Sequence, residues 1–170
     1  MKSPINILAV IGLTFGGVFG MAGSFTANPH LQASLWAIDS AGLVMATALL
    51  ALKYFRTGHD LVAGGFLVFA IAEAVLMSGT AAGPAASVPA FAAGTALWAI
   101  ALLLVSIPRQ FALPVRLLGL VSAILFTIVA ARIFQGEQLL PTSAPLPFFA
   151  YPFLVMTFMG WIWSLLREKA

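Results

Sequence analysis

Residues 61–79 read LVAGGFLVFAIAEAVLMSG, a run of 19 residues whose only charged member is Glu73. A helix of about 20 apolar residues is long enough to cross the hydrocarbon core of a bilayer. Five further stretches have the same character, at residues 5–23, 35–54, 88–107, 113–134 and 147–166. None alternates polar and apolar residues as the strands of a membrane barrel do. Because backbone groups in lipid must pair within their own segment, we expect an all-α, polytopic membrane protein with six transmembrane helices.

The composition excludes a soluble domain, because 62% of the 170 residues are hydrophobic and only 8% are charged, against about 25% in a soluble domain. The net charge of +3 is better explained by membrane orientation than by nucleic-acid binding. The chain contains no cysteine and only two histidines, His30 and His59, which the expected topology places on opposite sides of the membrane. We therefore expect neither a metal site nor a cofactor.

The basic residues predict the orientation of the chain. Only Arg132 falls on the outer side, whereas seven basic residues fall on the side of the two termini: Lys2, Lys53, Arg56, Arg109, Arg116, Arg167 and Lys169. The positive-inside rule therefore predicts that both termini are cytoplasmic, in a bacterial inner membrane. The first span has features of a signal peptide, but it is long enough to cross the membrane and we expect it to be retained.

Glycines at the outer ends of the odd-numbered spans recur at a nearly constant interval. Gly23, Gly79 and Gly136 are 56 and 57 residues apart, and a proline follows each after five or six residues. This pattern predicts three antiparallel αα hairpins, about 1–57, 58–112 and 113–170, as a threefold internal repeat of about 57 residues within one domain, residues 1–170. The alternative is that helical hairpins commonly end in glycine and then proline, without common ancestry.

The first span carries a glycine face formed by Gly12, Gly16 and Gly20, each four residues from the next. Small residues at this spacing allow two helix backbones to approach closely. The face indicates either packing within the chain or an interface with a second copy or with partner helices. In both cases the lipid bilayer is a further expected partner.

The large aromatic residues are interpreted as an interfacial belt, in which Trp and Tyr side chains lie at the headgroups. The residues concerned are Trp36, Trp98, Tyr151, Trp161 and Trp163.

Three charged residues within the spans have no role in topology: Asp39, Glu73 and Arg132. Counted from the span ends at 1.5 Å per residue, all three lie roughly 6–9 Å below the outer boundary. A charge that faces lipid near mid-membrane costs at least about 2.5 kcal/mol, so these side chains should face the bundle. They either form a salt-bridge cluster between helices, or leave one carboxylate to be neutralised by a proton, a bound cation or a cationic substrate.

Polar residues of the outer loops could extend this cluster into a vestibule: Asn28, His30 and Glu137. The charged trio favours binding or passage of a small solute or ion from the outer face. One alternative is a non-catalytic accessory or scaffold subunit that uses the glycine face. A third hypothesis, an intramembrane enzyme acting on a lipid or quinone beside Asp39 and Glu73, is less favoured because no catalytic or nucleotide-binding motif is present.

Overall fold

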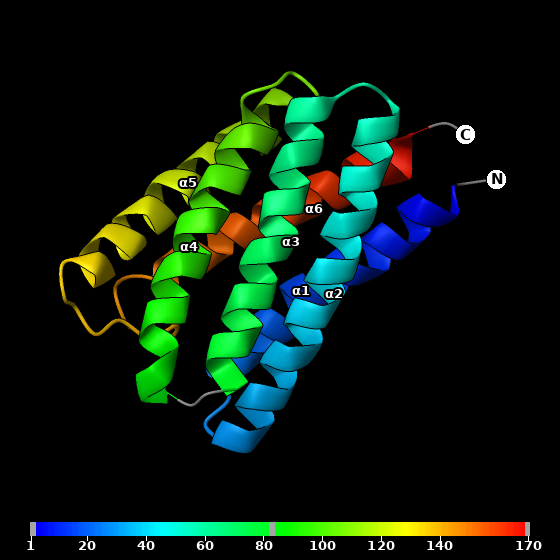
Figure 1. Cartoon of the computed structure of the whole chain (residues 1–170). Helices are drawn as coiled ribbons and strands as arrows, with labels where there is room; N and C mark the ends of the chain where they lie inside the picture. The colour runs from blue at the N-terminus through cyan, green and yellow to red at the C-terminus, as the bar shows by residue number, and fades with distance from the viewer. Residues whose placement is uncertain (1–2, 82–83, 169–170) are drawn as a thin grey trace.

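The computed structural model describes residues 3–81 and 84–168, and these residues are almost entirely helical (Figure 1). The helices are α1 (Pro4–Phe25), α2 (Pro29–Arg56), α3 (Asp60–Ala81), α4 (Pro84–Ser106), α5 (Leu113–Phe134), the short 3₁₀ helix η1 (Phe148–Ala150) and α6 (Tyr151–Arg167). Within the described residues, six helical segments are long and apolar enough to cross a membrane. The structure thus confirms an all-helical chain of the multi-pass membrane type.

The helices pack mainly on their neighbours in sequence. Figure 1 shows α2, α3, α4 and α5 side by side in chain order, with α1 and α6 crossing behind this row. Contacts between α1 and α6 close the arrangement into a bundle. The contacts of α2 with α3 and of α4 with α5 are more extensive than that of α5 with α6. The packing therefore does not by itself establish three hairpin units, and the threefold repeat stays a prediction.

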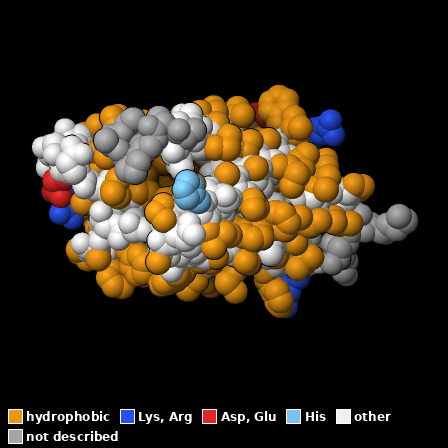
Figure 2. Space-filling view, turned by 90° about the horizontal axis from the view of Figure 1, so that it is seen from below, with side chains coloured by type: hydrophobic (Ala, Val, Ile, Leu, Met, Phe, Trp, Pro, Cys, Tyr) orange, Lys and Arg blue, Asp and Glu red, His pale blue; other side chains and the backbone are white. Residues whose placement is uncertain are grey.

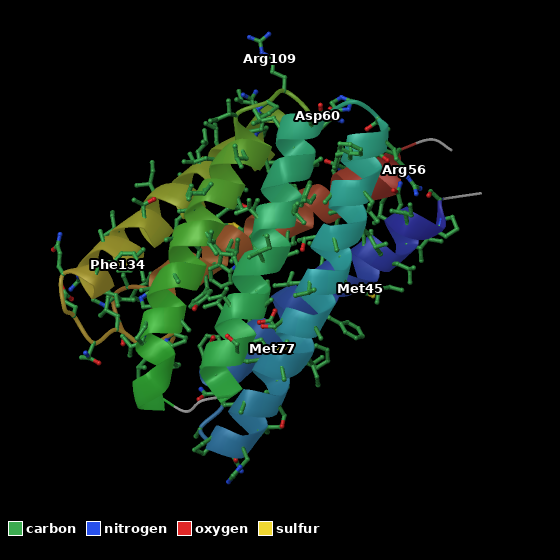
Figure 3. The ribbon with its side chains drawn as sticks, viewed as in Figure 1. Met45, Arg56, Asp60, Met77, Arg109 and Phe134 are labelled. Carbon is green, nitrogen blue, oxygen red and sulfur yellow. The ribbon has the colours of Figure 1, made fainter. Side chains whose placement is uncertain are left out.

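Both ends of the described chain lie at one end of the bundle, which we call the terminal end (Figure 1). Arg56, Asp60 and Arg109 lie at this same end, and Arg109 points away from the bundle (Figure 3). Lys2 and Lys169, two of the seven basic residues on which the predicted orientation depends, lie outside the described residues. The opposite end, which carries the α1–α2, α3–α4 and α5–α6 connections, is the distal end; Figure 2 shows it as mostly hydrophobic, with charged side chains only near its rim.

Helix α2 begins six residues earlier than the sequence analysis expects, at Pro29 rather than at residue 35. The side chain of Asn28 accepts hydrogen bonds from the backbone N–H groups of His30 and Leu31, which satisfies two donors that the first helical turn leaves free. Proline fits the first helical position because its missing N–H would have no partner there. The early start adds a turn and a half of helix at the distal end.

Aromatic rings fill the terminal half of the bundle. Tyr54 stacks on Phe66 with ring centroids 5.5 Å apart, and Phe66 meets Trp161 edge-on at 4.9 Å. Phe111, from the α4–α5 connection, packs edge-on against both Tyr54 and Phe66. All four residues are buried, so this half of the bundle forms a solid core.

The interpretation of the large aromatic residues as an interfacial belt is wrong for two of them. The side chains of Trp98 and Trp161 are only 6% and 1% exposed and lie in the core. Trp163, by contrast, is at the surface, where the Arg167 guanidinium lies 4.1 Å from its ring centroid. Large aromatic side chains of these helices therefore lie either between helices or at the surface, and their residue type alone does not decide which.

The glycine face of α1 packs against α2 within the chain. A Cβ atom at Gly12 would lie 2.3 Å from the backbone oxygen of Gly42, a distance that no side chain can occupy. At Gly16, a Cβ would fall inside the space of the Leu43 side chain. The first interpretation of this pattern, packing within the chain, is therefore confirmed, and a contact with another copy through the same face stays a prediction.

Candidate functional site

A cavity of about 300 Å³ lies in the distal half of the bundle. Its wall comes from α1, α2, α3, α4 and α6 and from the α5–α6 connection. Ala33 and Thr80, near the helix ends, are exposed lining residues, whereas Ser40 and Glu73 line the wall deeper in and are buried. The cavity therefore runs from the distal surface into the bundle.

Glu73 of α3 is held in the cavity wall by donors from two neighbouring helices. Its side chain is only 1% exposed. The Ser40 hydroxyl of α2 donates to Oε2 at 3.1 Å, and the indole N–H of Trp98 on α4 donates to Oε1 at 2.9 Å. Hydrogen bonds to a carboxylate are strong, because the acceptor carries charge. These two bonds fix the position of the Glu73 carboxylate.

Asp39 of α2 lies in the same wall, one residue before Ser40. Its Oδ1 atom is buried and, within the described part of the chain, accepts no hydrogen bond. The missing side chain of Gly20 on α1 makes room for this carboxylate, since a Cβ there would lie 2.9 Å from Asp39 Oδ2. Asp39 and Glu73 line the same cavity. The structure thus brings together two of the three predicted intramembrane charges.

Arg132 does not join the two carboxylates, and the expectation of a single cluster of three charges is wrong. Its guanidinium contacts the Glu137 carboxylate, with Nη2 2.6 Å from Oε2 and Nε donating to Oε1 at 2.8 Å. The reason is the position of α5, which contributes no residue to the described cavity wall. Figure 3 shows Phe134, the last residue of α5, on the opposite side of the bundle from Met45 of α2.

The three loop residues predicted for an outer vestibule do not line the cavity. Asn28 caps α2, His30 is exposed, and Glu137 is occupied with Arg132. The residues that line the mouth next to them are Pro29 and Gln32, and the side-chain amide of Gln32 donates to the Gly23 carbonyl at 3.0 Å.

Aromatic side chains make up much of the remaining wall, a feature that the sequence analysis did not foresee. They are Trp36, Phe91, Trp98, Tyr151 and Phe158. Trp98 stacks on Phe69 with ring centroids 5.8 Å apart and meets Tyr151 edge-on at 6.2 Å. The sequence contains an indication of this wall, because the tetrapeptide Leu-Trp-Ala-Ile occurs at residues 35–38 and again at 97–100. Both tryptophans of this repeated sequence face the cavity.

The same aromatic residues close the cavity towards the terminal end. Phe158 in the wall packs edge-on against Phe69, with centroids 5.8 Å apart. Phe69 in turn packs on Trp161 at 6.2 Å, and Phe69 and Trp161 are both buried. Behind them lies the aromatic core described above. The site is therefore a cup that opens distally and has an apolar floor.

Comparison of the chain with protein-family models, with curated proteins and with the solved structures gave no match. Within residues 3–81 and 84–168, no group of three His, Cys, Asp or Glu side chains is arranged to hold a metal ion. An apolar cavity with a few convergent polar groups is the usual form of a small-molecule site. Asp39 and Glu73 supply these polar groups here.

Proposed function

We propose that this protein binds a small solute in the distal cavity, with Asp39 and Glu73 as its polar contacts. The observation that carries the proposal is the Asp39 carboxylate, which lines the cavity and whose buried Oδ1 atom has no donor among the described residues. A buried acceptor without a partner costs about 1–3 kcal/mol. A ligand that donates a hydrogen bond to the Asp39 carboxylate offsets part of that cost.

The size of the cavity limits the solute. Ligand sites in proteins measure roughly 300–1,000 Å³, and this cavity, at about 300 Å³, is at the lower end of that range. The ligand is accordingly a compact molecule rather than a lipid or a nucleotide.

Binding is favoured over passage by the aromatic floor. A solute that moved on from Glu73 towards the terminal end would have to displace Phe69 and Trp161, which are both fully packed. Protein interiors are packed as densely as organic crystals, so these described floor residues close the route in this conformation.

The orientation supports capture from outside the cell. The described basic residues Arg56 and Arg109 lie at the terminal end (Figure 3), and positively charged loops are retained in the cytoplasm. We infer that the terminal end is cytoplasmic, that the membrane is a bacterial inner membrane, and that the cavity opens to the outer face.

The threefold hairpin repeat stays part of this proposal. Its support is that Trp36 and Trp98, which hold equivalent places in the repeated tetrapeptide, both line the cavity. A duplicated hairpin that brings the same side chain to the same cavity would produce this arrangement.

The proposal is tested by labelling single cysteines, for which this cysteine-free chain is well suited. Val155→Cys places a thiol in the cavity wall, and Met156→Cys, on a side chain 40% exposed outside the cavity wall, is its neighbour at the same depth. We expect a membrane-impermeant methanethiosulfonate reagent, added to intact cells, to label the first and not the second. Equal labelling of both, or labelling of Val155→Cys only from the cytoplasmic side, would refute the proposal.

A further inference from the structure

We infer that the solute is an organic monoammonium ion, a single amine on a compact apolar body, whose N–H groups bind the Asp39 carboxylate. This inference rests on the proposed function and adds the chemical class of the ligand. It follows from three properties of the cavity: its acidic side chains, the unsatisfied carboxylate of Asp39 and the character of its wall.

The described wall carries acidic side chains and no basic ones. Asp39 and Glu73 are its only charged members, and the other polar lining residues are neutral hydroxyls and the amide of Gln32. Arg132, the only lysine or arginine on the distal side among the described residues, is bound to Glu137 outside the wall, and His30 is exposed and does not line it. Charges interact strongly in a cavity of low dielectric constant. Carboxylates in this wall therefore repel an anionic ligand and attract a cationic one.

The hydrogen bonds assign different roles to the two carboxylates. Both oxygens of Glu73 already accept bonds, from Ser40 and from Trp98, so Glu73 is held in place by the chain itself. The Asp39 carboxylate lines the cavity, and its buried Oδ1 accepts no bond from the described chain. An ammonium group carries up to three N–H donors and no acceptor, which is the complement of a carboxylate.

The apolar wall favours an organic cation over a metal ion. Calcium takes six to eight oxygen ligands, and magnesium keeps several of its waters, whereas most of this wall is aromatic and aliphatic. Trp36, Phe91, Trp98, Tyr151 and Phe158 offer ring faces and edges to the ligand. Rings attract cations at their faces and bury apolar groups at the same time. An amine that carries a small ring or branched alkyl group satisfies both parts of the site.

The test measures how three phenyl-bearing probes of similar size protect Val155→Cys from the thiol reagent in purified protein. The probes are phenethylamine, 2-phenylethanol and 3-phenylpropionate, which differ in charge and share the ring. We expect saturable protection by the amine, and at least about tenfold weaker protection by the alcohol and the acid. Asp39→Asn should weaken protection by the amine about tenfold or more, whereas Glu137→Gln, a carboxylate outside the cavity, should leave it unchanged.

A second variant keeps the inference testable if Asp39→Asn does not fold. Gly20→Ala would push on Asp39 Oδ2, the mobile end of a side chain, and should weaken protection while both carboxylates remain. Protection by the alcohol equal to that by the amine would overturn the ammonium assignment and leave the solute cavity intact. Protection by none of the three probes would overturn both.

Discussion

The close approach of α1 and α2 at Gly12 makes a quantitative prediction about stability. Gly12→Ala adds a Cβ atom 2.3 Å from the backbone oxygen of Gly42 and 2.8 Å from the Cβ of Ala46. Ordinary contacts begin at 3.4 Å, so α1 has to move away by about 1 Å along part of its length. Gly17→Ala, five residues further along the same helix, meets only Val155 at 3.6 Å and is the matched control.

The magnitude follows from comparing the two variants. Each gains the same helix propensity, about 0.8–1 kcal/mol for alanine over glycine, so this contribution cancels in the difference. Overpacking of a well-packed contact costs about 1–3 kcal/mol. We therefore expect Gly12→Ala to be less stable than Gly17→Ala by about 1–3 kcal/mol.

The assay is equilibrium unfolding in mixed micelles, followed by far-ultraviolet circular dichroism or by steric trapping. Equal free energies of unfolding for the two variants would show that Gly12 does not face α2 in the protein, and would refute the reasoning for the whole α1–α2 contact. A loss in Gly17→Ala alone would place Gly17, and not Gly12, at the tight contact of α1 with its neighbours.

Three further predictions concern the core and the terminal end. Trp98→Phe keeps a ring in place but removes the donor to Glu73 Oε1, and should lower the free energy of unfolding by about 1–3 kcal/mol; an unchanged value would mean that this bond is not formed. Phe66→Ala removes a fully buried ring and should cost about 3–5 kcal/mol in the same assay, with a cost below 1 kcal/mol contradicting a solid aromatic core. Lys53→Met removes the partner of Glu168. Because both side chains are partly exposed, the free energy of unfolding should fall by only about 0.2–1 kcal/mol, and by less at high salt. A larger loss that salt does not change would contradict a surface ion pair.

That Asp39 and Glu73 lie near each other could be predicted from the sequence, but the direction in which Arg132 points from its helix could not. Counting from the span ends placed Asp39, Glu73 and Arg132 at one level, and the structure brings the first two to one cavity. Arg132 faces elsewhere and binds Glu137. In a soluble helix the polar face reveals which side is buried, whereas lipid is as apolar as the core. Hydrophobic periodicity therefore carries little information about which side of α5 faces inward.

The aromatic wall was missed for a different reason. Trp98 lies in the interior of the predicted span 88–107, too far from either end for the headgroup region, so its position alone argued against a belt residue.

The start of α2 could also have been predicted from the sequence, because Asn28 followed by Pro29 is a typical helix beginning. The predicted span was limited to the apolar part of the helix, and the helix continues beyond it.

The most direct test of the central claim is the charge selectivity of thiol labelling inside the cavity. The rates at which a trimethylammonium and a sulfonate methanethiosulfonate reagent modify Val155→Cys are compared with and without the two carboxylates. We predict that the cationic reagent reacts at least about tenfold faster when Asp39 and Glu73 are present, as expected for carboxylates that line the same cavity as the thiol. The preference should disappear when Asp39→Asn and Glu73→Gln are combined. Equal rates for the two reagents with both carboxylates present would contradict an acidic cavity open to the outer face.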